Sequence, residues 1–215
     1  MLFRSPVATF QKPAVRTKTR AAVPQTSDDF KSRTLGLQWQ WNANHEENWC
    51  SLTERKGWLR LRVRPVPNAE LANAPNLLMQ KFPAREFKAE TRMEFSPARA
   101  GEEAGLVIMG RAYAALSVRQ AADGPQVVFR DNGSDSVLAK LKAGDALTLR
   151  VEVREGGLCS FSYSTGGGIF TSAPNIFQAQ PGHWIGARAG LYCIATGSGA
   201  GGHADFDRFE MLPLK

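Results

Sequence analysis

The sequence predicts an all-β protein in which two antiparallel sheets pack face to face as a sandwich. Runs in which apolar and charged residues alternate recur along the chain, and a period of two is typical of half-buried strands. Clusters of Gly, Asn and Asp separate these runs and supply the positive φ angles that tight hairpins require. About a dozen such strands, without a convincing amphipathic helix, indicate a two-sheet fold.

Three runs carry the alternation most clearly, at 59–63, 87–95 and 147–153. In the first, Leu59, Leu61 and Val63 alternate with two arginines. Turn residues follow or separate the strands at 123–124, 131–133, 155–157 and 165–168. The stretch 65–75, rich in Asn and Pro, is the one long irregular loop that we expect.

Residues 1–27 differ from the rest of the chain because they hold five basic residues, three prolines and no acidic residue. This composition predicts an extended linker over 1–27 and one folded domain over 28–215. The linker also explains most of the formal net charge of +7, since the other residues carry 22 basic against 20 acidic side chains. The folded part shows no basic stripe, and we expect no nucleic-acid partner.

Neither a membrane span nor a secretion signal is apparent. The longest apolar runs, at 104–110 and 190–196, are far shorter than the ~20 residues that span a bilayer, so we expect no membrane partner. The first twelve residues lack the apolar segment of a secretory signal. The sequence therefore predicts that the chain as encoded stays in the cytoplasm, whatever compartment its relatives occupy.

The three cysteines are Cys50, Cys159 and Cys193, and no two of them have the spacing of metal ligands. Buried thiols in strands are the favoured interpretation, with a single Cys159–Cys193 bridge as the alternative. The Gly-rich stretch 197–202 formally satisfies G-x-G-x-x-G, but a strand and not a helix is expected after it. A surface loop is therefore favoured over a dinucleotide site.

The sequence offers no catalytic residue that we would name. A glycosidase needs two carboxylates held across a cleft. Most carboxylates here fall on the solvent side of alternating strands, and Glu46 and Glu47 lie in an irregular loop without features of a catalytic pair. An independent hydrolase is therefore the weakest of the functional hypotheses.

Tryptophans suggest a different chemistry, because sugar C–H groups pack on aromatic rings. Trp39 and Trp41 share an expected strand face with Leu37, which favours a place in the core. For Trp49 and Trp58 core and surface are equally favoured. We therefore take Trp49 and Trp58, together with His45, as the candidate carbohydrate-binding residues.

Several segments, taken in order, resemble the C-terminal concanavalin A-like (jelly-roll) sandwich of family 43 glycoside hydrolases, the β-xylosidases and α-L-arabinofuranosidases. The resemblance covers residues 27–211 and extends to the linker, which is similar to the connector between the catalytic propeller and the sandwich. The segments are SDDF (27–30), LGLQWQWN (35–42), APNLLMQKF (74–82), AGLVIMG (104–110), CSFSYS (159–164), WIGA (184–187) and GGHADFDRF (201–209).

The resemblance implies a non-catalytic accessory module, a truncated or stand-alone copy of the sandwich that supports degradation of xylan or arabinan side chains. The implied partner is a family 43 propeller, which holds the catalytic acids in that family. In some members the sandwich lends a loop to the rim of the active site, and 42–48 is the candidate here. The alternative is an autonomous carbohydrate-binding module whose ligand is a xylan or arabinoxylan oligosaccharide.

The resemblance also implies a structural calcium ion where the first and last strands meet. Sandwiches of this lectin-like class hold calcium there, and the segments 28–30 and 205–207 are similar to their ligand segments. Asp29 and Asp205 are the expected carboxylate ligands, with backbone carbonyls completing the set that calcium prefers. The alternative is that both aspartates cap turns or face solvent.

Overall fold

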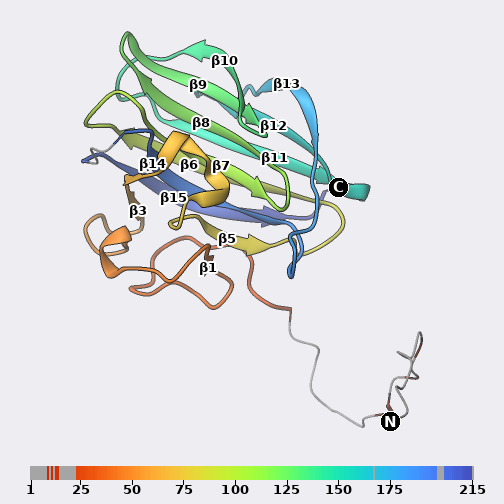
Figure 1. Ribbon diagram of the computed structural model, residues 1–215. Coiled ribbons are helices and arrows are strands. Elements are labelled where there is room, and N and C mark those ends of the chain that lie inside the picture. Colours follow the sequence, from red (N-terminus) through yellow and green to blue (C-terminus); the bar gives the residue numbers. More distant parts are fainter. Residues whose placement is uncertain are drawn as a thin grey trace, which may run out of the picture.

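The protein folds as a sandwich of two sheets in the computed structural model (Figure 1). The structure describes residues 23–166, 168–197 and 201–214, together with positions 9, 11, 13 and 14. Most of the linker predicted over 1–27 therefore lies outside the described residues. Where the chain is described, helical turns are short 3-10 segments, as the absence of helical periodicity predicts. No helix in this part of the chain is long and apolar enough to cross a membrane.

One sheet has eight strands in the order β1-β5-β14-β7-β8-β9-β10, with β4 pairing in parallel with β14. Neighbours along the path are antiparallel. Its strands are β1 (Gln40–Trp41), β4 (Arg64–Pro65), β5 (Leu78–Lys81), β7 (Glu102–Met109), β8 (Tyr113–Ala121), β9 (Gly124–Asp131), β10 (Ser134–Lys140) and β14 (Arg188–Ala195).

The other sheet has seven strands in the order β13-β12-β11-β6-β15-β3-β2, all antiparallel. The predicted runs at 59–63, 87–95 and 147–153 form β3, β6 and β11. Its strands are β2 (Cys50–Ser51), β3 (Leu59–Arg62), β6 (Phe87–Ser96), β11 (Leu147–Arg154), β12 (Leu158–Ser164), β13 (Thr171–Gln178) and β15 (His203–Leu212).

The main core lies between the two sheets, where the inward positions of the alternating strands meet. Side chains such as Leu61, Ala89 and Val151 are buried, while the residues next to them on the outer face are half-buried. This one-sided burial is why these strands show a period of two in sequence. Phe129 and Phe161, from opposite sheets, pack with ring centroids 5.5 Å apart.

A second apolar cluster covers the outer face of the eight-stranded sheet. The irregular segment 66–77 lies on this face and contains the short helices η2 (Pro67–Ala69) and η3 (Leu71–Asn73). Leu71 and Leu77 from this segment pack with Val107 and Tyr192 of the sheet. Strand β7 is consequently buried on both faces along its whole length.

The cysteines follow the favoured interpretation, and a strand follows the Gly-rich stretch as expected. All three cysteines are free: Cys159 and Cys193 are buried in strands of different sheets, and Cys50 is half-buried. Burial raises the pKa of Cys159 to about 12. The stretch 197–202 leads directly into β15, so no helix follows it; residues 198–200 lie outside the described residues. The hairpin between β9 and β10 turns at Asn132 and Gly133, both with positive φ.

Strand β13 forms an edge of the seven-stranded sheet. Pro174 lies in this strand, where the register with β12 shifts between Ser160 and Ser162. Proline has no backbone N–H, so in sheets it is confined to edges and bulges. At this position the edge strand offers one donor fewer to solvent or to another chain.

Candidate functional site

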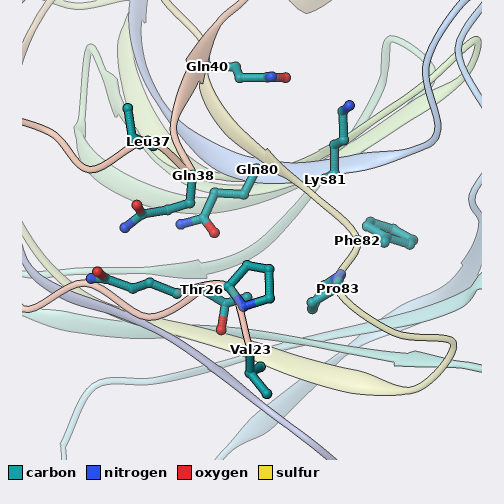
Figure 2. Close-up of a pocket in the computed structure, with 11 residues that line it drawn as sticks. Val23, Thr26, Leu37, Gln38, Gln40, Gln80, Lys81, Phe82 and Pro83 are labelled. Atoms are coloured by element: carbon teal, nitrogen blue, oxygen red, sulfur yellow. The ribbon is translucent and has the colours of Figure 1, made fainter. Parts of the chain in front are cut away.

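A groove of about 370 Å³ opens at the edge of the eight-stranded sheet, beside the segment that leads into the domain (Figure 2). Its walls come from three stretches that are distant in sequence: the extended residues 23–26, the turn before β1, and the end of β5. We call it the linker groove, lined by residues 23–26, 37, 38, 40 and 80–83.

The turn before β1 gives the groove its most exposed apolar side chain. The backbone N–H of Trp39 donates to the carbonyl of Gly36 at 3.2 Å, so the chain reverses here and β1 begins only at Gln40. Leu37 lies in this turn and is fully exposed, at 103%. The prediction that Leu37 shares a buried strand face with Trp39 and Trp41 is therefore wrong, because these residues do not form one continuous strand.

Trp39 is held in the core at the base of this turn. Its Nε1 donates to Oδ2 of Asp28 at 2.8 Å, and its ring stacks on Phe30 with centroids 5.9 Å apart. Asp28 also exchanges two backbone hydrogen bonds of 2.9 Å with Phe209 of β15. The first residues of the domain are thus fastened to its last strand, and they fix the position of the groove walls.

Two glutamine side chains reach into the linker groove, as Figure 2 shows. Nε2 of Gln38 donates to Oδ2 of Asp28 at 3.2 Å. Gln80 is only 2% exposed, and its Nε2 has no hydrogen-bond partner among the described residues. A buried amide nitrogen without a partner costs free energy, so a rotation of the Gln80 side chain that brings Nε2 to an acceptor in the groove would be favourable.

A second groove lies on the other side of Leu37. It has a volume of about 690 Å³ and is lined by residues 33–37, 39, 41, 45, 47 and 50–53. We call it the Trp41 groove. The exposed His45 ring lies parallel to Trp41, with centroids 5.9 Å apart and planes at 10°. The loop 42–48, our candidate rim loop, therefore borders this groove.

The structure separates the three candidate carbohydrate-binding residues. Trp49 is 3% exposed and packs edge-on against Trp41 at 5.5 Å, so its ring offers no free face to a sugar. The prediction that Trp49 binds carbohydrate at the surface is therefore corrected, because its ring is buried against Trp41. His45 is exposed, but its ring is stacked on Trp41.

Trp58 belongs to a different cluster, on the outer side of the seven-stranded sheet. The guanidinium of Arg55 lies 3.5 Å from its ring centroid and that of Arg92 lies 5.4 Å away. Cation–π contacts of this kind stabilise the arginines above the ring. A sugar could stack on the Arg55 side only by displacing that guanidinium.

Trp184 is the tryptophan with the exposed ring, at 97%, and it lies between β13 and β14. Sequence reasoning did not select it, although Gly and Pro on either side mark the stretch as a loop. An apolar ring in such a loop has no strand face to occupy, and that is the signal that could have identified it. Trp184 therefore joins Leu37 among the large apolar side chains left at the surface.

The two expected calcium ligands have other partners. Asp29 is exposed and accepts from Nζ of Lys31 at 2.8 Å. Asp205 is 4% exposed and accepts from Arg60 at 2.7 and 2.8 Å and from Arg55 at 3.1 Å. Among the described residues, no cluster of three His, Cys, Asp or Glu side chains has metal-binding geometry.

Glu103 is, with Glu102, one of two glutamates in the described part of the chain that are inaccessible to solvent. It accepts from Arg119 at 2.6 Å, Arg130 at 3.2 Å, Ser117 at 3.0 Å and Tyr192 at 2.5 Å. Burial and the nearby carboxylate raise the pKa of Tyr192 well above its ordinary value. These contacts satisfy the carboxylate within the fold, which is the arrangement of a structural network.

The loop carboxylates Glu46 and Glu47 are both exposed. Glu46 pairs with Arg64 at 3.3 Å, and Glu47 lines the Trp41 groove. The structure thus gives the groove one carboxylate of this pair.

Comparisons with known proteins agree with this architecture. The family model of the β-xylosidase C-terminal concanavalin A-like domain matches residues 27–212. A β-xylosidase of Formosa agariphila is 30% identical over 95% of this chain, and an α-L-arabinofuranosidase of Bacteroides ovatus is 25% identical over 87%. This chain spans 37% of the length of each of these two relatives.

Solved structures give the same result. A GH43 protein of Bacillus licheniformis is 27% identical with a TM-score of 0.75, covering 87% of this chain and 39% of that protein. A bifunctional GH43 protein of Bacteroides eggerthii is 27% identical with a TM-score of 0.79, covering 88% of this chain and 26% of that protein. The chain belongs to the family of β-xylosidase C-terminal concanavalin A-like domains, the sandwich module of family 43 glycoside hydrolases.

Proposed function

We propose that the domain is a non-catalytic accessory module that packs against the catalytic propeller of a family 43 glycosidase. In this role it supports the hydrolysis of xylosyl or arabinosyl linkages without contributing an acid–base pair. The observation that carries the proposal is the family match over 27–212, in a chain that spans 37% of a β-xylosidase.

The chemistry of the described carboxylates supports a non-catalytic role. Hydrolysis of a glycosidic bond requires one carboxyl as acid and a second as base or nucleophile, both facing the same cleft. Here Glu103 and Asp205 are held by arginines, and Glu102 accepts backbone N–H groups of the loop before β15 and of Ala98. Each of these buried groups is engaged in holding the fold.

The candidate for a loop that reaches the rim of the propeller's active site is 42–48. His45 and Glu47 of this loop border the Trp41 groove, which shares Leu37 with the linker groove. A loop in this position lies close to whatever the linker connects to the sandwich.

The experiment uses the Formosa agariphila β-xylosidase produced without its own C-terminal domain. We expect the purified 215-residue chain to bind it, and to raise both its thermal midpoint and its turnover of an aryl β-xyloside. The matched control is an unrelated β-sandwich of similar size at the same concentration. Absence of binding at micromolar concentrations of both proteins would contradict the proposal.

Autonomous carbohydrate binding is the second candidate, and the exposed ring of Trp184 is the observation that favours it. An exposed indole supplies the flat apolar surface on which a pyranose packs. Affinity electrophoresis in soluble arabinoxylan tests this candidate. Retardation that disappears in Trp184→Ala would establish it, and equal mobility with and without polysaccharide would dismiss it.

A further inference from the structure

The end of β5 has an open edge on the side of the linker groove. Strand β1 pairs with β5 only at Gln40–Met79 and Trp41–Leu78, whereas β14 pairs with β5 as far as Lys81. In an antiparallel ladder, successive residues direct their backbone groups to alternate sides. In this register the backbone N–H and C=O of Met79 point toward β1. Those of Lys81, two residues later, point to the same side, where β1 has ended and the groove begins.

A residue that lines the groove also holds a buried donor that lacks an acceptor. Nε2 of Gln80, 2% exposed and without a partner among the described residues, belongs to a residue that lines the groove. The open edge and this amide lie on consecutive residues. A backbone carbonyl of an added strand is the kind of acceptor that would satisfy such a donor.

The remaining walls are nearly uncharged, and they combine five apolar side chains with the uncharged polar side chains of residues 25, 26, 38 and 40. Leu37 and Val23 are 103% and 90% exposed, and Pro24 and Pro83 lie beside them. Among the described residues that line the groove, Lys81 carries the single charge. This combination fits an extended, apolar polypeptide segment, which gains backbone hydrogen bonds from the edge and side-chain contacts from the walls.

The position of the groove indicates what lies next to it in an enzyme. Residues 23–26 form one wall, and the family match begins at residue 27. In the β-xylosidases this domain is C-terminal, so the remainder of the enzyme precedes it and is connected through this segment. A tether that ends at the groove gives a segment of that remainder a high effective concentration there.

We propose that the linker groove is the docking site for an extended apolar segment of the catalytic domain, which adds to the open edge of β5. Leu37 is the apolar anchor between the two grooves, and Gln80 donates its free amide to the added segment. This inference rests on the proposed function, because its occupant is the propeller that the module supports.

Three variants test it, with the Formosa agariphila enzyme lacking its C-terminal domain as the probe. Leu37→Asp is expected to raise the dissociation constant about tenfold or more, since a central anchor carries much of the binding energy. Val137→Asp is the matched control, because Val137 is an exposed apolar residue on β10, at the opposite edge of the same sheet. We expect it to bind as the unmodified chain does.

Gln80→Leu provides a readout that a merely structural role would not give. Removing an amide whose buried nitrogen has no partner should leave the thermal midpoint of the free chain unchanged or higher, while docking becomes several-fold weaker. A lower midpoint together with unchanged binding would show that Gln80 supports the fold and not the interface.

Hydrogen exchange locates the contact directly. In the complex, the backbone amide of Lys81 should exchange more slowly than in the free chain, by a factor of about ten or more, whereas amides of β10 should be unaffected.

If the unmodified chain binds but Leu37→Asp and Val137→Asp bind equally well, the docking site is elsewhere and the accessory function stands. If the unmodified chain does not bind, both proposals fail. Protection of Lys81 by xylobiose instead of the protein probe would overturn the inference in favour of a sugar site.

Discussion

Arg60 and Asp205 lie directly opposite each other on the antiparallel strands β3 and β15, and they form a bidentate ion pair. Nε of Arg60 donates to Oδ1 of Asp205 at 2.7 Å, and Nη2 donates to Oδ2 at 2.8 Å. Arg55 adds a third hydrogen bond at 3.1 Å. The residue that resembles a calcium ligand in sequence is therefore neutralised by guanidinium groups from a neighbouring strand and loop.

Asp205→Asn should lower stability in a pH-dependent way. Burial alone raises the pKa of Asp205, but hydrogen bonds from Arg60 and Arg55 outweigh it and hold the pKa below its ordinary value. A lowered folded-state pKa contributes stability that is present above about pH 4 and is lost as pH falls through the folded pKa. We expect a loss of about 2 kcal/mol at pH 7 that shrinks below pH ~4, measured by urea unfolding. Asp207→Asn is the control, and an equal loss at both positions would contradict the argument.

Calcium binding by Asp29 and Asp205 is tested by thermal melting. An ion that binds only the folded state raises the midpoint as its free concentration increases. The proposed site thus requires a higher midpoint in millimolar calcium than in chelator, and loss of that difference in Asp205→Ala. The ion would have to replace the contacts that Arg60 and Arg55 now make with the carboxylate. Coincident melts under all three conditions would remove the site.

Glu103→Leu is expected to be among the most destabilising single substitutions in the domain. It would leave Arg130, with a side chain only 4% exposed, beside an apolar group but still paired with Asp135 at 2.7 Å, so we expect a cost near the lower end of the ~3–5 kcal/mol that breaking a buried pair takes. Glu155→Leu is the matched control, since Glu155 pairs with Arg85 at the surface and should cost less than ~1 kcal/mol. Urea midpoints of the two variants decide the matter; similar midpoints would refute the network as a stabilising element.

The purified chain should not hydrolyse aryl β-xylosides or aryl α-L-arabinofuranosides above background. The reason is that the buried carboxylates hold arginines and backbone amides, and the Trp41 groove has the single carboxylate Glu47 among its described lining residues. Release of p-nitrophenol is the measurement. Turnover that persists through repurification and disappears when one carboxylate of this chain is replaced would refute the prediction.

Shortening the chain at its N-terminus should separate the linker from the fold. A chain that begins at Val23 should unfold cooperatively at the midpoint of the full chain. A chain that begins at Phe30 loses the paired backbone bonds of Asp28 with Phe209 and the acceptor of Trp39 Nε1, and should melt about 5 °C lower or more. Equal midpoints for the two shortened chains would place the start of the fold after residue 29.

The sequence predicts the two-sheet architecture because several strands have one face toward the core and one toward solvent. In β3, β6 and β11 every second residue packs inward, so burial leaves a visible period of two. Strands β7 and β14 are buried almost throughout, because the segment 66–77 covers their outer face. Their apolar runs show that something is buried, but not which element covers it.

The candidate site is less predictable, because it depends on partners that are distant in sequence. The burial of Trp49 depends on how Trp41 packs, and the role of Asp205 depends on Arg60, 145 residues away. The prediction for Leu37 is wrong because a turn closes at Trp39. Within 36–39 only one residue, a glycine, is of a type that favours a turn. Residue patterns predict which face of a strand is buried, but they do not predict which side chains from distant parts of the chain contact each other.

The position of Pro174 has a consequence for the molecule in a crowded solution. A free sheet edge is a template on which a second copy can add its own edge, and repetition of that step produces fibrils. On β13 the missing N–H at Pro174 and the register shift beside it interrupt any such ladder after a few residues. Growth of the seven-stranded sheet is therefore terminated at this edge by the covalent structure of one residue, and that protection does not depend on pH, salt or the presence of a partner.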